Sequence, residues 1–141
     1  MIILKHIYRF ANLLFILAII VFATSCKNKQ TSPSEYLKGI SEIAAQYDTK
    51  CPIDQGNGTR LESVTFEDRT LIFRLSLSDE AITTVNLDNT RDSIIHNMSS
   101  KLKKYLIKGR CKLIYKYVSP HDSSYVEIIP KELENSLQKE K

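Results

Sequence analysis

The sequence predicts a small α+β domain: one antiparallel sheet with two helices on one face, in the order α-β-β-α-β-β. Apolar residues recur at helical spacing over residues 33–47 and again over 92–108. The stretches "RTLIFRLSL" and "CKLIYKYV" alternate apolar with polar residues, which is typical of half-buried strands. Each helix has one apolar stripe to bury and the strands have one apolar face, so we expect the two to pack together.

The first 25 residues have the pattern of a secretory signal peptide. Lys5 and Arg9 precede an apolar run over residues 13–23, and small residues follow it in "ATS". A membrane-spanning helix needs about 20 apolar residues, and this run is shorter. The stretch "FATSC" resembles the lipobox of bacterial lipoproteins, with Ala23 where Leu is usual, and this resemblance implies acylation of Cys26. A plain signal cut nearby and an uncleaved membrane anchor remain as alternatives.

This leader predicts a lipoprotein of the bacterial cell envelope that faces the periplasm. Palmitate and related acyl chains on Cys26 would give enough anchors for stable membrane attachment. Residues 26–32 would then be the lipidated cysteine and a polar tether. Loss of Lys5 and Arg9 lowers the formal net charge from +4 to +2. So weak a surplus on an exported chain does not indicate a nucleic-acid partner.

The elements of the domain, residues 33–130, follow from local patterns. The stretch "SPSE" from Ser32 has the form of a capping box with proline at the first helical position, and begins the helix over 33–47. Strands begin at Arg60 and after the turn at residues 67–69. The second helix, 92–108, ends at Gly109. A hairpin follows with its turn at 119–124, and residues 131–141 are a polar tail.

Two cysteines remain besides Cys26. Cys51 and Cys111 are the remaining thiols of a chain expected in an oxidising compartment, where paired thiols usually form a disulfide. We therefore predict a Cys51–Cys111 bond, which would stabilise the fold by about 3–4 kcal/mol in the chain-entropy model. A reactive thiol at Cys51 is the alternative, although no C-x-x-C motif accompanies it.

The stretches "CPIDQGNGTRLESV" and "CKLIYKYVSPHDSSYVEIIP" resemble a set of small exported bacterial lipoproteins of unassigned function. Their shared pattern is Pro-x-Asp followed by a Thr-Arg-Leu-(Asp/Glu)-Ser-Val strand and then a tyrosine-bearing hairpin. The resemblance covers about residues 47–130 and implies an envelope location, a compact domain and no particular reaction. The matching positions are Pro52, Asp54, Thr59, Arg60, Leu61, Ser63, Val64, Tyr115, Tyr117 and Ile129.

No motif for catalysis, metal or cofactor is present. The chain lacks a Gly-x-Ser-x-Gly nucleophile elbow and a P-loop. His96 and His121 lack the ligand spacing of a zinc site. A Ser-His-Asp set can be assembled from His121 with Ser123 or Ser124, but neighbours in sequence do not make a triad. The sequence therefore predicts a protein that is not an enzyme and holds neither metal nor cofactor.

A basic segment provides the first candidate surface. Seven basic residues lie between Lys101 and Lys116, and no acid occurs between Asp92 and Asp122. Lys101, Lys104 and Lys108 share one helix face, which suits anionic headgroups or an acidic envelope protein, or else is a solvated face. Tyr115 and Tyr117 suit a partner interface or a sheet face.

The second candidate is the glycine-containing loop at residues 51–60. Asp54, Asn57 and Arg60 could bind a small polar ligand, while Pro52 and the glycines equally suit a turn that leads into the first strand. The sequence thus predicts a non-enzymatic interaction module anchored in the envelope, with a small-molecule-binding protein as the alternative.

Acylation of Cys26 is directly measurable. We expect the intact mass of the protein extracted from membranes to equal residues 26–141 plus a diacylglyceryl group and one further acyl chain. A Cys26→Ala variant should be recovered without those groups. The mass of the full unmodified chain would contradict the lipoprotein assignment.

Overall fold

The structure is a computed structural model, and it describes residues 32–139. The predicted leader, Cys26 and most of the tether lie outside the described residues. In chain order the elements are α2 (Pro33–Asp48), β1 (Ile53–Gly56), β2 (Thr59–Glu67), β3 (Thr70–Ser76), α3 (Asp79–Thr83), α4 (Leu87–Asn97), α5 (Ser100–Gly109), β4 (Lys112–Val118), β5 (Ser123–Ile128) and α6 (Pro130–Lys139).

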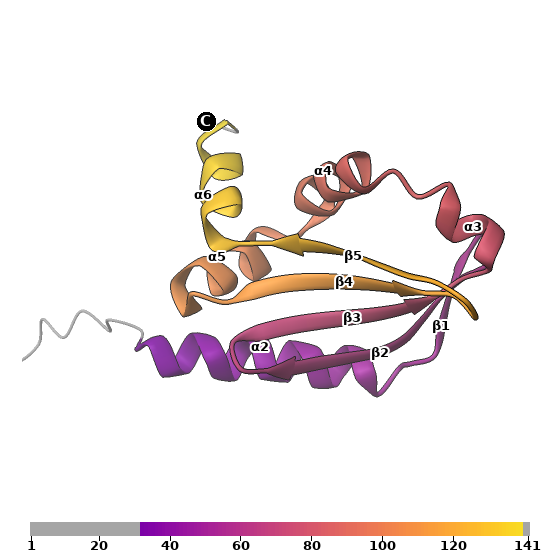
Figure 1. The fold of residues 1–141 in the computed structure, drawn as a ribbon. Helices are drawn as coiled ribbons and strands as arrows, with labels where there is room; N and C mark the ends of the chain where they lie inside the picture. The colour runs from indigo at the N-terminus through magenta and orange to yellow at the C-terminus, as the bar shows by residue number, and fades with distance from the viewer. Residues whose placement is uncertain (1–31, 140–141) are drawn as a thin grey trace, which may run out of the picture. The chain divides into compact units, whose positions relative to one another are not determined.

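The five strands form one mixed sheet in the order β1-β2-β3-β4-β5 (Figure 1). The predicted β2–β3 and β4–β5 hairpins are confirmed, but the fully antiparallel sheet is wrong because β3 and β4 pair in parallel. The physical reason is the connection between them. Three helices carry the chain back to the end of the sheet where β3 began, so β4 runs in the same direction as β3.

The predicted first helix is confirmed as α2, whereas the predicted helix over 92–108 is wrong in its extent. The chain forms two helices there, α4 and α5, separated at Met98, whose backbone is extended. Each begins at its own cap: the Asn86 side chain accepts from the backbone N–H of Asn89, and Ser99 accepts from that of Leu102. Because each helix begins at its own N-cap, the range predicted as one helix from its apolar spacing belongs to two.

One face of the sheet forms the core. Leu71, Phe73 and Leu75 of β3 point to this face and are buried, while Arg74 between them is exposed on the other. Figure 1 shows α2 running alongside β2 and α4 near β5, and the contacts between these elements agree. The largest fully buried side chains are Ile40, Leu71, Leu106, Leu113, Ile128, Leu133, Val126 and Cys111.

The helices α2 and α5 approach each other at Gly39. A Cβ at this position would collide with the ring of Tyr105, so glycine lets this ring lie directly against the backbone of α2. Tyr105 also meets Tyr36 edge-on at 5.7 Å between ring centroids. At the other end of α5, the backbone of Gly109 faces Leu37 and Ile40 of α2. The first half of α2 is thus closely joined to α5.

The range predicted as a polar tail contains α6. Leu133 is fully buried, and the Glu132 carboxylate accepts from the backbone N–H of Ile129 at 2.9 Å, which caps the helix start. Its packing against α5 adds a further helix to the core.

The predicted Cys51–Cys111 disulfide is wrong, because both cysteines are free thiols. Cys51 comes just before β1 and Cys111 just before β4, and β2 and β3 separate these strands. At about 4.8 Å between neighbouring strands, β1 and β4 lie about 14 Å apart. A disulfide requires Cα atoms within about 7 Å. The two Sγ atoms instead contact the carbonyl oxygens of Tyr47 and Gly109, each at 3.3 Å.

The two thiols should therefore differ in reactivity. Burial raises the pKa of both, and the nearby carboxylates of Asp48 and Glu62 raise that of Cys51 further. We expect slow alkylation of half-buried Cys51 in the native protein and alkylation of fully buried Cys111 only after unfolding. In denaturant both should be alkylated equally with and without reductant, as mass spectrometry will show. If the two cysteines are alkylated only after reduction, the protein does contain the Cys51–Cys111 disulfide.

Candidate functional site

The described residues form a groove of about 870 Å³ over the core face of the sheet. Leu75 and Leu113 form part of its floor. The β1–β2 hairpin and Tyr47 of α2 form one wall, while α3, α4 and Leu102 of α5 form the other. Its volume lies within the usual range of ligand and peptide pockets.

Aromatic rings cover much of the floor. Phe73 and Tyr115 stack with ring centroids 4.8 Å apart and planes 6° apart. Tyr47 meets Phe73 edge-on at 5.8 Å. Burial raises the pKa of Tyr115 to about 12, with smaller effects from Tyr117 and Tyr47, and burial raises that of Tyr117 too. These phenols therefore stay neutral at any physiological pH.

Among residues 32–139, none of those that line the groove is charged. This is unexpected in a chain of which 26% is Asp, Glu, Lys or Arg. Apolar side chains form the floor, and amides and hydroxyls form the rim. A groove of this composition favours an apolar, hydrogen-bonding ligand, because a charged group entering it would lose water and meet no counter-charge.

The rim on the α4 side is a stripe of small polar residues. Asn89, Ser93 and Asn97 recur every four residues and so share the helix face that lines the groove. The sequence did not predict this stripe, because the predicted helix began at residue 92 and Asn89 lay outside it. The Asn86 cap and the four-residue period were the available signal.

Several polar groups of the groove have no partner among residues 32–139. The hydroxyls of Tyr115 and Tyr117 make no hydrogen bond to another described residue, nor do the side chains of Gln55, Asn57 and those of the α4 stripe. Such groups are available to a bound molecule, which could satisfy them with its own backbone or side-chain groups.

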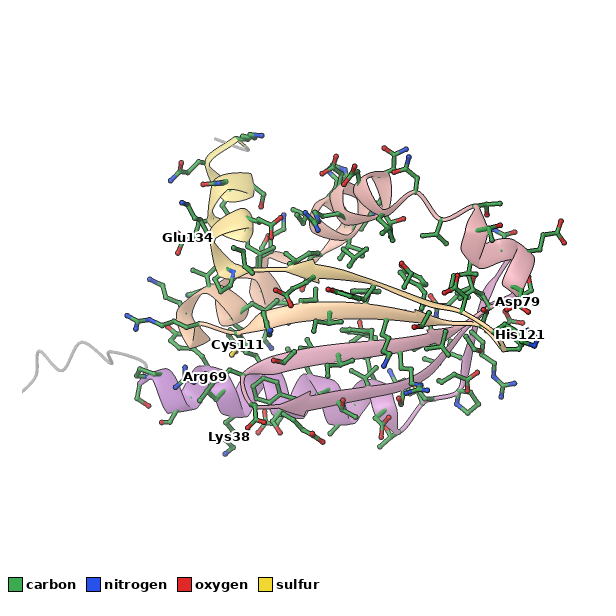
Figure 2. All side chains as sticks on the ribbon, in the orientation of Figure 1. Lys38, Arg69, Asp79, Cys111, His121 and Glu134 are labelled. Atoms are coloured by element: carbon green, nitrogen blue, oxygen red, sulfur yellow. The ribbon has the colours of Figure 1, made fainter. Side chains whose placement is uncertain are left out.

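A cluster around Asp79 holds α3 at the end of the sheet. The Asp79 carboxylate accepts from the hydroxyl of Ser119 at 2.6 Å and from the backbone N–H of His121 at 3.0 Å. Its other oxygen lies 2.7 Å from Nδ1 of His121, and Figure 2 shows both side chains at this end of the sheet. The cluster joins the β4–β5 turn to α3, whose Ala81 lines the groove.

This cluster contains Ser, His and Asp but does not have the geometry of a catalytic triad. In a triad the histidine lies between the hydroxyl and the carboxylate, whereas here Ser119 and His121 both bond to Asp79. Ser123 and Ser124, considered from sequence, form no side-chain hydrogen bond with this histidine. The arrangement positions a turn and a helix.

The predicted partner-binding residues fall on two separate surfaces. Tyr115 and Tyr117 line the groove. Lys101, Lys104 and Lys108 are exposed on α5 and do not line it. A role of these five residues in partner binding stays a prediction. The tyrosines and the lysines would belong to two separate sites.

The alternative ligand site is only partly assembled. The Asp54 carboxylate accepts from the backbone N–H of Gly56 at 2.8 Å, which shapes the β1–β2 turn. Arg60 lies 3.7 Å from the carboxylate of Glu62. Of the three predicted residues, Asn57 lines the groove. A ligand role for this loop stays a prediction. The predicted order α-β-β-α-β-β is wrong here, because the range predicted as a turn before the first strand contains a strand of its own, β1.

No protein-family model matches the chain, and no curated protein sequence matches it significantly. Solved structures do share its fold. A predicted secreted protein of Pseudomonas aeruginosa has a TM-score of 0.62 at 15% identity, over 75% of this chain and 99% of that one. The Vibrio vulnificus type 2 secretion system pilotin EpsS has a TM-score of 0.55 at 9% identity, over 72% of this chain and 94% of that one.

A third structure, the type II secretion system pilotin AspS from Vibrio cholerae, has a TM-score of 0.50 at 11% identity and covers 70% of this chain and 96% of that one. At these identities the likeness shows the fold alone. Over residues 32–139, no helix has the length and apolarity needed to cross a membrane. The same range contains no group of three or more His, Cys, Asp or Glu side chains placed to hold a metal ion.

The Asp79 cluster should make stability depend on pH. Hydrogen bonds from Ser119 and His121 lower the pKa of Asp79 from its ordinary value of 3.8. A lowered folded-state pKa stabilises the fold above pH 3.8, and this contribution is lost as the pH falls through the folded-state pKa. Asp79→Asn should therefore be less stable than the natural protein at pH 7, and the difference should shrink below pH 3.8.

Urea unfolding from pH 7 down to pH 2.5 measures this difference. Glu67→Gln is the matched control, because Glu67 is exposed at the end of β2 and has no ion pair among the described residues. It should change stability little at any pH. A deficit of Asp79→Asn that is the same at both ends of the range would contradict the proposed stabilisation.

Proposed function

We propose that this protein is a lipid-anchored lipoprotein of the bacterial envelope that binds an amphipathic segment of an envelope protein in its groove. The uncharged lining of the groove is the observation that carries the proposal. An amphipathic segment would place its apolar side chains on the aromatic floor and its polar backbone or side chains against the amide rim.

The comparisons support an envelope role. The chain shares its fold with two pilotins of type II secretion systems and with a predicted secreted protein. The leader sequence points to the same compartment independently of the fold. We therefore propose a role like that of a pilotin, in which the module holds a component of an envelope assembly at the membrane and catalyses no reaction.

The extent of the lining and the opening to solvent favour a protein segment over a small molecule. Its lining extends from the β1–β2 hairpin to α4, and it is partly open to solvent. Ligand pockets usually enclose most of their ligand, whereas an open trough suits a segment that continues beyond it. A small polar ligand near Asp54, Asn57 and Arg60 remains the second candidate.

Photo-cross-linking in intact cells tests the proposal. A photoreactive phenylalanine analogue in place of Asn97 lies on the groove rim, and the same analogue in place of Thr65 lies on β2, outside the groove. We expect one recurrent protein adduct from position 97 and none from position 65. Equal adducts from both positions, or no protein adduct, would contradict capture in the groove.

A charge on the rim provides the matching loss-of-function test. Ser93→Glu places a carboxylate where the groove has none, so the yield of the position-97 adduct should fall about tenfold, which corresponds to about 1.4 kcal/mol of binding free energy. Thr65→Glu adds the same charge outside the groove and should leave the yield unchanged. An unchanged yield from both variants would argue against an uncharged contact surface.

A further inference from the structure

The exposed face of α5 carries basic side chains that have no counter-ion among the described residues. Lys104, Lys108 and the adjacent Arg110 are exposed and form no ion pair with another residue of the range 32–139. Lys101 lies 5.6 Å from the centroid of the Tyr105 ring, a cation–π contact that leaves the ammonium exposed. We call Lys101, Lys104, Lys108 and Arg110 the basic face.

The basic face lies beside the beginning of the domain. Tyr105 of α5 packs on Tyr36 and Gly39, in the first two turns of α2. The polypeptide from Cys26 to Pro33 can extend at most about 25 Å. A lipid anchor at Cys26 would therefore hold the start of α2, and α5 with it, near the membrane surface.

We infer that the basic face of α5 binds anionic phospholipid headgroups and so orients the domain on the membrane. This inference rests on the lipid anchor of the proposed function. A membrane fits the geometry better than an acidic protein, because the anchor would bring the lipid surface to this face whether or not a partner is present. Tyr36 and Tyr105, with apolar rings and polar hydroxyls, suit the headgroup region.

This orientation separates two tasks on the molecule. The basic face lies on the exposed side of α5, while Leu102 of the same helix lines the groove. Headgroup binding would therefore leave the groove open for its protein segment. At 0.1 M salt, the attraction between exposed charges is screened beyond about 10 Å. The basic face must therefore lie close to the headgroups to be attracted to them.

Lysine footprinting on the membrane-extracted protein tests the inference. The full mature protein is reconstituted into vesicles of phosphatidylcholine alone or with 30% phosphatidylglycerol, acetylated briefly and analysed by mass spectrometry. We expect acetylation of Lys101, Lys104 and Lys108 to be about fivefold slower in the anionic vesicles. One basic residue near an anionic surface strengthens membrane binding by about this factor. The protection should disappear in 0.5 M salt.

Exposed lysines elsewhere serve as internal controls. Lys116 on β4 and Lys50 after α2 should react at the same rate in both vesicles. In Lys104→Gln/Lys108→Gln the remaining Lys101 should lose most of its protection, because the attraction is collective. The matched variant Lys116→Gln/Lys50→Gln should keep it.

Each other outcome contradicts the inference in its own way. Equal acetylation in the two vesicles, or equal slowing of all lysines, would overturn it. Protection in both vesicles that survives high salt would indicate a protein or a second copy on α5. An intact mass without acyl groups would overturn the anchor and this inference together, whereas a lipidated protein with unprotected lysines would overturn this inference alone.

Discussion

The parallel pairing of β3 with β4 is the constraint on which the rest of the domain depends. It is held at both ends: the backbone N–H of Lys112 donates to the carbonyl of Arg69 at 3.0 Å, and that of Leu77 donates to the carbonyl of Val118 at 3.1 Å. The guanidinium of Arg69 also donates to the carbonyl of Gly109 at 2.8 Å, which ties the end of α5 to the β2–β3 turn. Parallel neighbours require a long crossover, and here that crossover supplies α3, α4 and α5.

The groove follows from that crossover. The helices α3 and α4, with Leu102 of α5, form one wall, and the inner residues of β3 and β4 form part of the floor. An antiparallel pairing would have needed only a short turn, and the sheet would have had no second wall. The Asp79 cluster joins the start of α3, the first helix of the crossover, to the β4–β5 turn. This wall of the groove is therefore attached to the sheet at its first helix.

The sequence predicted the elements better than their connections. Periodicity and the Ser32 to Glu35 pattern located α2, and strict alternation located β3 and β4. The direction of β4 could not be predicted, because pairing depends on where the crossover returns the chain and not on any local pattern. The disulfide failed for the same reason, since Cys51 and Cys111 are separated by two strands whose order local patterns do not encode.

The candidate site was predicted in fragments. Tyr115 and Tyr117 were identified as an aromatic surface, but alternation alone does not say whether a sheet face is packed or open to a groove. The α4 stripe of Asn89, Ser93 and Asn97 has the composition of a loop, so its helical period was overlooked. The absence of charge around the groove is a property of the assembled residues, which come from elements far apart in the chain.

Gly39 gives this domain one position whose identity is set by geometry alone. A larger residue there would displace the Tyr105 ring, because even one methyl group would meet it. Tyr105 shares α5 with Leu102, which lines the groove, and with the lysines of the basic face, so a displacement passed on to α5 would reach both surfaces. Two surfaces without a common residue are therefore connected through one contact, between the backbone of Gly39 and the ring of Tyr105.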